Sequence, residues 1–287
     1  MATTRRSGKS ADPVEERGFV PVDGTELHYR SAGSGPCLVF VHAGVTDSRL
    51  WNHQLEAFAG DYRDIAYDLR GFGRSVLPPG PYAHHEDLHR LFDELGVDSA
   101  HVVGSSVGAA VAVDFALEHP TRVRSLALVG PALGGYQFTD DATRAGWEAA
   151  ADAFEDGDLD RVADIESGIW LAGVGRSLDD VDPGVRDLVR TMLLRSYELD
   201  DERATERELD PPAIDRLDEL AVPVLVVYGD HERADIVDIA ELLAERLDDV
   251  TVEVLANTAH LPPLERPDGF TATLATFLGR VTDGAFE

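Results

Sequence analysis

A serine between two glycines is the residue of this sequence whose surroundings point most directly to chemistry. Ser106 is the centre of Gly-Ser-Ser-Val-Gly at residues 104–108, a G-x-S-x-G pattern. An apolar run at residues 100–103 precedes it and indicates a buried strand, and a helical stretch follows it to about His119. A G-x-S-x-G between a strand and a helix is typical of a nucleophile elbow, a sharp turn that exposes a reactive serine.

The glycine spacing favours Ser106 over its neighbour Ser105 as the nucleophile. Side chains two positions before and after the serine would collide in so sharp a turn, so both positions need glycine. Ser106 has glycine at both positions, whereas Ser105 has valine at both. The following helix directs its N-terminus at the serine, so the backbone N–H of Val107 can face a developing oxyanion. For the pentapeptide alone, the alternative is a glycine-rich turn with a serine that caps the helix.

The elements around this turn follow an alternation of strands and helices. A hairpin with an Asp-Gly turn comes first. Strand-like apolar runs, separated by helical patterns, then lie at residues 37–41, 65–67, 123–129, 223–228 and 250–255. This order predicts an α/β fold with a doubly wound, mostly parallel sheet of about eight strands.

The alternation is interrupted in the middle of the chain and is absent at its start. Residues 135–212 are rich in charge, show helical periodicity without a convincing strand and end at a pair of prolines, so we predict a helical insertion there. Residues 1–17 are polar and charged without apolar periodicity, and we predict a disordered tail. Residues 18–134 and 213–287 then form the core.

The charge balance limits the partners that the chain can bind. Its 54 Asp and Glu residues against 25 Lys and Arg give a formal net charge of −29, and Lys9 is the single lysine. Such a charge disfavours nucleic acid and anionic membrane as partners, and no apolar run is long enough to span a bilayer. We interpret the acidic surface as a halophilic adaptation. No secretory h-region follows the N-terminal residues, which favours a cytoplasmic location.

Five segments, in combination and in order, resemble the α/β-hydrolase family. They are a His-Gly-type loop (42–45), D-x-R-G-x-G-x-S (68–75), the G-x-S-x-G turn, a glycine-plus-acid turn after a late strand (229–232) and a histidine loop after the last strand (257–267). The chain is similar to the compact, lidded members of this family, which include serine esterases, enol-lactonases and cofactor-free haloperoxidase-like enzymes. The resemblance covers nearly all of residues 19–280 and implies that the insertion is a lid.

The resemblance implies a catalytic triad in the chain order serine, acid, histidine. Ser106 would be the nucleophile. His260 would be its base, because it is the one of the ten histidines that lies past the last predicted strand. The acid is open between two residues: relatives place it three residues past the late-strand glycine, which is Glu232 here, whereas Asp230 lies one residue past that glycine. We favour Glu232 and keep Asp230 as the alternative.

Further site residues follow from the same resemblance. The oxyanion hole would combine the N–H of Val107 with that of Gly44, two residues past the histidine of the first loop. Trp147, Trp170 and Leu261 would contact an apolar part of the substrate. Aromatic residues at helical spacing are also typical of the core of a lid, which is the alternative for the two tryptophans.

A second motif indicates a different chemistry, that of a zinc site. Residues 85–89, His-Glu-Asp-Leu-His, satisfy H-E-x-x-H, which on a helix would place two histidines on one face for zinc, with the glutamate as base. The pattern is short, has no third ligand downstream at a suggestive spacing, and continues as an amphipathic helix. We therefore interpret this stretch as a helix that packs on the sheet, and we expect no metal.

We expect a serine hydrolase that cleaves a small carboxylic ester or lactone through an acyl-enzyme, without a metal or organic cofactor. A serine in the elbow disfavours the epoxide hydrolase and haloalkane dehalogenase branches of the family, whose nucleophile is aspartate. The alternative from another class is a small-molecule binding or receptor protein on the same fold with little turnover, because fold does not fix function. The sequence leaves the substrate and the oligomeric state open.

Overall fold

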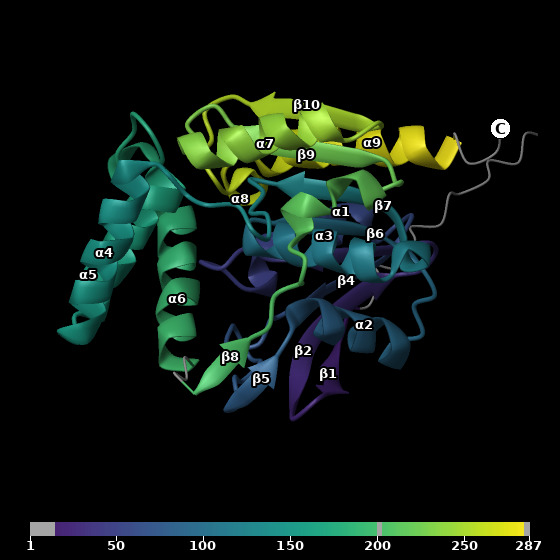
Figure 1. The fold of residues 1–287 in the computed structure, drawn as a ribbon, viewed down its shortest axis with the longest axis horizontal. Helices are drawn as coiled ribbons and strands as arrows, with labels where there is room; N and C mark the ends of the chain where they lie inside the picture. The colour runs from purple at the N-terminus through teal and green to yellow at the C-terminus, as the bar shows by residue number, and fades with distance from the viewer. Residues whose placement is uncertain (1–14, 200–202, 284–287) are drawn as a thin grey trace, which may run out of the picture.

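The computed structural model describes residues 15–199 and 203–283, and an eight-stranded sheet lies at the centre of this part of the chain (Figure 1). In sheet order its strands are β1 (Glu16–Val22), β2 (Thr25–Gly33), β4 (Arg63–Tyr67), β3 (Cys37–Val41), β6 (Ala100–Ser105), β7 (Val123–Val129), β9 (Val224–Gly229) and β10 (Val250–Leu255). β2 pairs antiparallel with β1 and with β4, and every later pair of neighbours is parallel. The predicted α/β fold with a mostly parallel sheet is confirmed.

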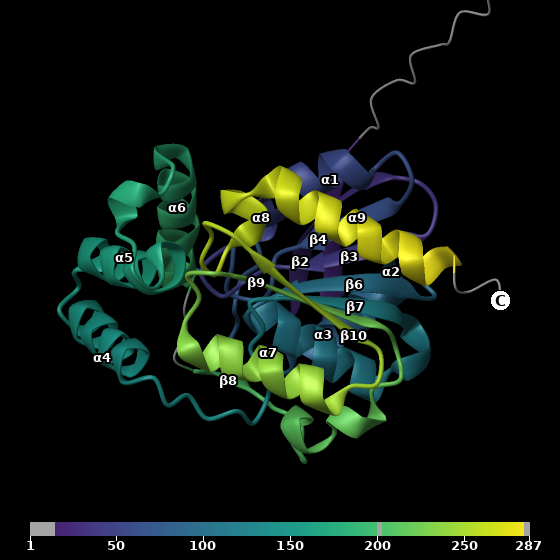
Figure 2. The same ribbon diagram turned by 90° about the horizontal axis from the view of Figure 1, so that it is seen from above.

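Helices cover both faces of the sheet because each directs apolar side chains toward it. α2 (His84–Glu94), α3 (Val107–Glu118) and α7 (Ala234–Arg246) contribute to one apolar core. α1 (Asn52–Phe58) and α9 (Pro267–Asp283) contribute to the core on the opposite face, and Figure 2 shows these two helices across the sheet from α3 and α7. The central strands are buried from both sides, which explains why they are continuous apolar runs in the sequence.

Between β7 and β9 the chain leaves the sheet and forms the helical insertion. Its long helices are α4 (Asp141–Glu155), α5 (Leu159–Ser167) and α6 (Pro183–Leu199), and a π-helix, η3 (Gly168–Ala172), follows α5 directly. Figure 1 shows the long helices standing to one side of the sheet. α4 and α5 share only a small apolar core of their own, whereas Trp170 and Leu171 of the π-helix join the two large cores.

One short strand in the insertion departs from the predicted all-helical pattern. β8 (Ala204–Glu206) pairs in parallel with β5 (Gly80–Tyr82) and forms a separate two-stranded sheet near the end of α6. A strand of three residues is too short to show a periodicity, and its partner lies far away in the sequence. The sequence pattern therefore contains no local signal for this pairing.

The start of the fold differs slightly from the predicted boundary. β1 begins at Glu16, inside the stretch 1–17 that we predicted as a tail, because it pairs with β2 and because Glu15 accepts hydrogen bonds from Arg17 and Arg30. Residues 1–14 of the predicted tail lie outside the described residues. The turn between β1 and β2 contains Gly24 at φ 80°, as the Asp-Gly turn requires.

Short helices complete the connections between these elements. They are η1 (Ser48–Trp51), η2 (Pro120–Arg122), η4 (Leu178–Asp180), η5 (Ala213–Asp215), η6 (Leu217–Glu219) and α8 (Pro262–Glu265). In the ranges 15–199 and 203–283, no helix combines the length and the apolar character needed to cross a membrane.

Candidate active site

Ser106 lies at the turn between β6 and α3. Its backbone has φ 54° and ψ −117°, a region that non-glycine residues rarely occupy and that costs conformational energy. The end of β7 and the loop after it hold Ser106 there: Ser106 N–H donates to the carbonyl of Val129 at 2.9 Å, and Ala132 N–H donates to the carbonyl of Ser106 at 3.2 Å. Ser106 is partly exposed, whereas Ser105 is fully buried. This is the backbone and exposure that a nucleophile elbow requires.

Two glycines make this turn possible, because backbone segments touch where their side chains would be. A Cβ on Gly104 would lie 2.2 Å from the carbonyl oxygen of Gly108. A Cβ on Gly108 would lie 2.4 Å from the carbonyl oxygen of Val41 in β3. Both distances are far below van der Waals contact, so the glycine on either side of Ser106 has a direct steric cause.

The two residues predicted to form the oxyanion hole are neighbours. A Cβ on Gly44 would lie 3.3 Å from Cγ2 of Val107, so the loop after β3 approaches the start of α3 closely. Val107 is the first residue of α3, and N–H groups in the first turn of a helix have no partner within that helix. Such groups carry partial positive charge and attract anions.

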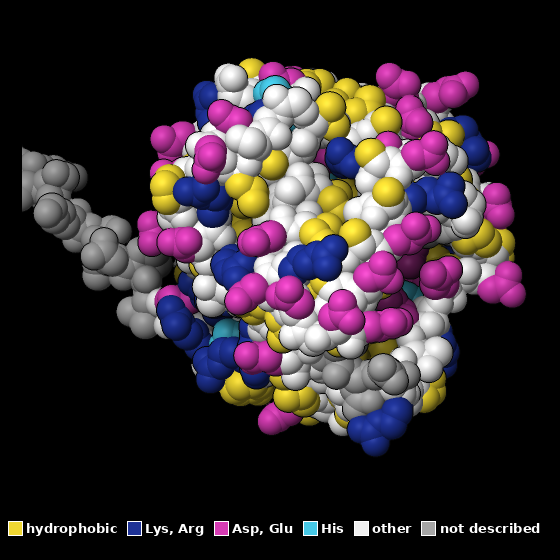
Figure 3. Space-filling model, turned by 90° about the vertical axis from the view of Figure 1, so that its left-hand side faces the viewer, with side chains coloured by type: hydrophobic (Ala, Val, Ile, Leu, Met, Phe, Trp, Pro, Cys, Tyr) yellow, Lys and Arg dark blue, Asp and Glu magenta, His cyan; other side chains and the backbone are white. Residues whose placement is uncertain are grey.

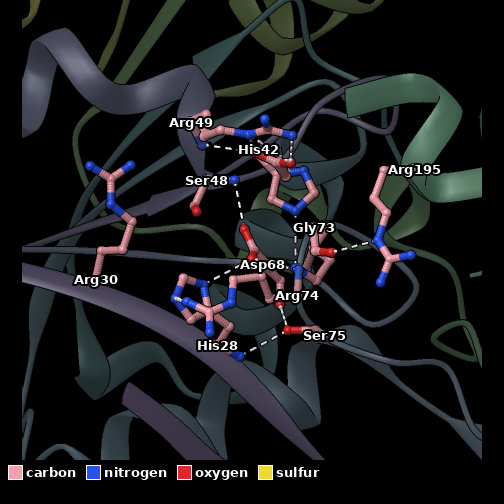
Figure 4. Close-up of polar contacts among 12 residues, drawn as sticks. His28, Arg30, His42, Ser48, Arg49, Asp68, Gly73, Arg74, Ser75 and Arg195 are labelled. Carbon is pink, nitrogen blue, oxygen red and sulfur yellow. Dashed lines mark hydrogen bonds and ion pairs between the residues drawn. The ribbon is translucent and has the colours of Figure 1, made fainter. Parts of the chain in front are cut away.

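The loop after β3 is fixed by a buried polar network centred on Asp68 (Figure 4). His42 Nε2 accepts from Leu69 N–H at 2.9 Å. Asp68 accepts from Ser48 N–H at 2.8 Å, and its other oxygen lies 2.9 Å from His28 Nδ1. Burial opposes ionisation, but the hydrogen bonds from His28 and Ser48 hold the pKa of Asp68 at about 2. Asp68 is thus a buried carboxylate that braces the turn, and His42 is held within its own loop.

His260 and Glu232 form a buried hydrogen-bonded pair. Glu232 follows β9 and His260 follows β10, and Nδ1 of the histidine lies 2.9 Å from Oε2 of the glutamate. The exposed fractions of the two residues are 1% and 7%. A carboxylate oxygen accepts a hydrogen bond from Nδ1–H, which fixes the tautomer and leaves Nε2 of His260 with a lone pair that can accept a proton.

Asp230, the alternative acid, lies elsewhere. Its side chain is exposed, and Oδ1 accepts from Thr258 N–H at 3.4 Å and lies 3.8 Å from Nε2 of His231. Asp230 therefore connects the loops after β9 and β10 at the surface. The structure brings Glu232 to His260 and leaves Asp230 outside this contact.

The segment after β7 joins the serine to the histidine–glutamate pair. Val129, the last residue of β7, accepts the hydrogen bond from Ser106. A Cβ on the next residue, Gly130, would lie 2.9 Å from Nδ1 of His260 and 3.2 Å from Oε2 of Glu232. Consecutive residues thus touch both parts of the site, and all of these groups lie at the carboxyl ends of parallel strands, where α/β proteins place their sites.

Trp170 of the π-helix covers the histidine. Its ring centroid lies 4.5 Å from that of His260, and its carbonyl accepts from His260 N–H at 3.2 Å. The indole N–H donates to Glu166 at 2.9 Å, and Trp147 lies 6.1 Å away between ring centroids. Leu261, also predicted to contact substrate, has no exposed surface and packs in the core beneath α9. Of the three predicted contacts, the two tryptophans lie together on the histidine side, and Leu261 is a core residue.

Residues 168–176, which we call the clamp segment, attach the insertion to the loop that carries Glu232. Val174 N–H donates to the carbonyl of His231 at 2.8 Å, and Nδ1 of His231 lies 2.8 Å from the carbonyl of Val174. Gly173, at φ 73°, allows this approach, because a Cβ there would lie 2.2 Å from the carbonyl oxygen of His231. The acid loop and the insertion are therefore held together backbone to backbone.

The clamp segment also reaches the histidine loop, through an ion pair that the sequence reasoning missed. Arg176 donates to Glu265 at 2.6 Å and to the carbonyl of Leu171 at 2.9 Å. The other oxygen of Glu265 accepts at 2.8 Å from the N–H of Ala259, the residue before His260. Glu265 lies in the quoted histidine loop, but no spacing in the sequence links this loop to Arg176.

The H-E-x-x-H stretch lies on α2, with its polar groups engaged by neighbours. Glu86 accepts from Arg207 at 2.8 Å, His89 lies 3.6 Å from Asp93, and the rings of His89 and His119 are stacked at 3.9 Å between centroids. Over the described ranges, no group of three or more His, Cys, Asp or Glu side chains is placed to hold a metal ion.

Comparison with known proteins agrees with this geometry. The sequence model of the "Alpha/beta hydrolase family" matches residues 38–273. The chain is 26% identical to carboxylesterase YbfK of Bacillus subtilis over 93% of its own length and 89% of that protein. It is 41% identical to epoxide hydrolase 2 of Siraitia grosvenorii, over only 39% of its length and 37% of that protein. The crystal structure of the enol-lactonase from Burkholderia xenovorans LB400 superposes with a TM-score of 0.76 at 26% identity, covering 91% of this chain and 100% of that one.

Proposed function

The chain belongs to the α/β-hydrolase family, and we propose that it hydrolyses a small carboxylic ester or lactone through an acyl-enzyme formed on Ser106. Two proteins that match over most of the chain are named carboxylesterase and enol-lactonase. The epoxide hydrolase match covers a minor part of the chain, and the residue at the elbow is serine rather than the aspartate of that branch. Carboxylic ester hydrolysis is the activity that the site and the comparisons favour together.

The proposed reaction assigns one role to each group. Nε2 of His260 takes the proton of the Ser106 hydroxyl as its oxygen attacks the ester carbonyl, and Glu232 stabilises the resulting imidazolium. The N–H groups of Val107 and Gly44 receive the negative oxygen of the tetrahedral intermediate. Collapse of the intermediate releases the alcohol with the proton from His260. Water, activated by the same histidine, then cleaves the serine ester and releases the acid.

The buried hydrogen bond between His260 and Glu232 is the observation that carries this proposal. Both groups are almost fully buried, and the segment that touches them also binds the backbone of Ser106. The carboxylate on Nδ1 orients the ring of His260, and Val129 with Gly130 connects this pair to the strained turn of Ser106. A base that a carboxylate orients next to a nucleophile is the arrangement that acyl transfer requires.

Turnover of p-nitrophenyl acetate by Ser106→Ala tests the nucleophile, with Ser105→Ala as the matched control. We expect Ser106→Ala to lower kcat by roughly 10⁵–10⁶ without unfolding the protein. Ser105→Ala should keep most of the activity, because that hydroxyl is buried and has no hydrogen-bond partner among the described residues. Equal losses in the two variants would contradict the assignment of Ser106.

Covalent labelling distinguishes an enzyme from a binding protein on the same fold. A fluorophosphonate probe should label wild type at Ser106, and a panel of short-chain esters and lactones should show turnover. Labelling without turnover of any member of the panel would favour a receptor with little activity instead.

We also propose that the insertion, residues 135–212, acts as a lid over this site, with the rest of the described chain as the core. Phe138, Trp147 and Trp170 form a chain of aromatic contacts that ends at His260, with ring centroids 5.0, 6.1 and 4.5 Å apart. Such a wall suits an apolar acyl or alcohol group. Trp147→Ala should raise KM for long-chain esters more than for acetate, and an equal effect on both would argue against this contact.

A further inference from the structure

A cavity of about 1010 Å³ lies apart from the candidate active site. It is bounded by one face of β2, by η1 with the start of α1, and by the turn of Gly73 and Arg74. Neither Ser106 nor His260 lines it. The proposed ester hydrolysis therefore does not account for this cavity.

The wall of this cavity gathers arginine in a strongly acidic chain. Arg17, Arg30, Arg49 and Arg74 line it, although the chain has only 25 Lys and Arg against 54 Asp and Glu. Figure 3 shows acidic side chains spread widely over the face of the insertion. A guanidinium group presents several N–H donors in a rigid fork that matches carboxylate and phosphate oxygens. Four carboxylates line the cavity as well, so an anionic ligand depends on guanidinium groups that these carboxylates do not neutralise.

The carboxylates of the wall are engaged by donors of the protein itself. Asp68 accepts from His28 and from two backbone N–H groups, and Figure 4 shows it at the centre of these contacts. Asp47 is 2% exposed and accepts from both the backbone and the guanidinium of Arg49. Glu56, the remaining acidic side chain besides Glu15, is exposed. The acidic groups therefore hold the wall in place or face solvent.

Two arginines share one carboxylate. Glu15 accepts from Arg17 at 2.7 Å and from Arg30 at 2.5 Å. Arg30 also donates to the neutral side chain of Asn52 at 2.5 Å, and its side chain is 13% exposed. One negative charge against two positive ones leaves this group with an excess positive charge. Arg30 is held between Glu15 and Asn52 in a largely buried position.

Arg74 is oriented without being neutralised. Over the described ranges its side chain has no carboxylate partner. Nη1 lies 3.3 Å from Nε2 of His28, and the guanidinium carbon lies 5.3 Å from the ring centroid of Phe19. Because Asp68 accepts from Nδ1–H of His28, the facing Nε2 has a lone pair that accepts from Arg74. A guanidinium that contacts a ring nitrogen and an aromatic face, and no carboxylate, keeps its charge and its remaining N–H groups available to a ligand.

We propose that this cavity binds a small organic anion, with Arg30 and Arg74 as its principal donors. Carboxylate and phosphate groups share the required chemistry, since both accept from a guanidinium fork. Ala32 and Leu55 add apolar surface to the wall, which suits a ligand with a carbon skeleton. The proposal does not depend on the chemistry at Ser106.

Isothermal titration with sodium benzoate and with inorganic phosphate tests this site. Ionic strength is kept constant with chloride, because a chain of net charge −29 responds to salt in general. We expect saturable binding of at least one anion by wild type. Arg74→Gln should weaken it about tenfold or more, as expected for loss of a hydrogen bond to a charged group. Arg190→Gln is the matched control, since Arg190 lies in α6 and bonds Asp160 and Asp164, outside the cavity.

The titrations distinguish a carboxylate site from a phosphate site, and they can also contradict the proposal. Binding of benzoate alone identifies a carboxylate site, binding of phosphate alone identifies a phosphate site, and competition between the two identifies a shared one. Equal weakening by Arg74→Gln and Arg190→Gln, or no saturable binding of either anion, would overturn the proposal. Arg30→Lys keeps a positive charge, and it should weaken binding if the fork of Arg30 is required. Fluorophosphonate labelling of Ser106 should be the same in all variants, which keeps this test independent of the proposed function.

Discussion

The two halves of the candidate site are built in different ways. In the nucleophile half, formed by the loops after β3 and β6, the turn itself is made of backbone, with glycine contacts at 104 and 108, a strained Ser106 and two N–H groups. The Asp68 network braces the loop after β3 beside it. The base half, formed by the loops after β9 and β10, is made of side chains, and the clamp segment holds it from outside the sheet. The first half depends on the sheet alone. The second depends on the sheet and on the helical insertion together.

This difference predicts different responses to substitution. A backbone-built half has no room for adjustment, because a new atom meets a carbonyl group that cannot turn away. A half built of side chains can lose one group and keep its fold, with activity lost instead. Substitutions of the glycines on either side of Ser106 should therefore reduce stability, and substitutions of Glu232 or His260 should reduce kcat while the fold stays intact.

The largest effect is expected for Gly104→Ala. The new Cβ would lie 2.2 Å from the carbonyl oxygen of Gly108, so β6 and α3 would have to separate, and we expect the loss of several kcal/mol, about 3 or more, in the free energy of unfolding. Gly279→Ala is the matched control, because no atom lies within 4 Å of its Cβ position in α9. It should stabilise by about 0.5–1 kcal/mol. Similar urea midpoints for the two variants would show that the turn at Ser106 tolerates an added methyl group, and would contradict the claim that it has no room.

The next effect concerns the acid. Glu232→Gln keeps the shape of the side chain but removes the charge that stabilises the imidazolium, so kcat should fall by roughly 10³–10⁴ with the fold intact. Asp230→Asn should cost about tenfold or less, because its side chain lies in the surface contact between loops. Steady-state kinetics of both variants measure the difference. The reverse ranking would make Asp230 the acid.

Asp64 lies in β4, and its substitution should change the stability of the sheet without changing activity. Burial raises the pKa of Asp64 to about 8, and neither oxygen has a hydrogen-bond partner among the described residues. The unfolded chain releases this proton near pH ~3.9, so the folded state holds more protons between these values, and stability falls as the pH rises through them. The loss is up to about 1.4 kcal/mol for each pH unit.

Asp64→Asn removes this titration. The variant should therefore gain stability relative to wild type at about pH 8 and gain much less at about pH 5, with kcat unchanged. Urea unfolding at the two pH values measures the gain, and the exposed Asp152→Asn is the control. The same gain at both pH values would show that Asp64 is ionised in the fold.

A smaller effect is expected at the clamp. Glu265→Gln should lower kcat about tenfold with KM unchanged, because Ala259 and His260 would shift slightly, and it should also destabilise by leaving Arg176 buried without its partner. The double variant with Arg176→Met removes the buried charge. Stability should then recover while kcat stays low, and recovery of both would make the pair purely structural.

The smallest effect concerns exchange rates within the insertion. Amides of α4 and α5 should exchange faster than those of β7, because their shared apolar core is small. Amides of residues 169–174 should exchange slowly, since the clamp segment packs into the large cores and bonds to the loops of the base half. Uniform protection of residues 140–199 at the level of β7 would contradict a mobile lid.

The sequence could predict the turn at Ser106 better than the side-chain contacts around His260. The turn around Ser106 was readable because steric need fixes residue type at fixed spacing, so two glycines identify it. The positions of the central strands along the chain were readable from apolar runs that are buried on both faces. The contact of Glu232 with His260 was predicted only by resemblance, because it depends on how two separate loops end. The pair of Arg176 and Glu265, the strand β8 and the core position of Leu261 depend on distant contacts, for which local spacing carries no signal.

The placement of the three tryptophans divides the intrinsic fluorescence of the chain between its two packing units. Trp51 is fully buried between Phe40 and Phe270 in the sheet core, so its emission should report only global unfolding. Trp147 and Trp170 belong to the insertion, and Trp170 lies against His260. A red shift that precedes the unfolding transition would therefore come from the insertion moving away from the histidine. The protein thus contains its own optical probe of opening, and no label is needed to follow it.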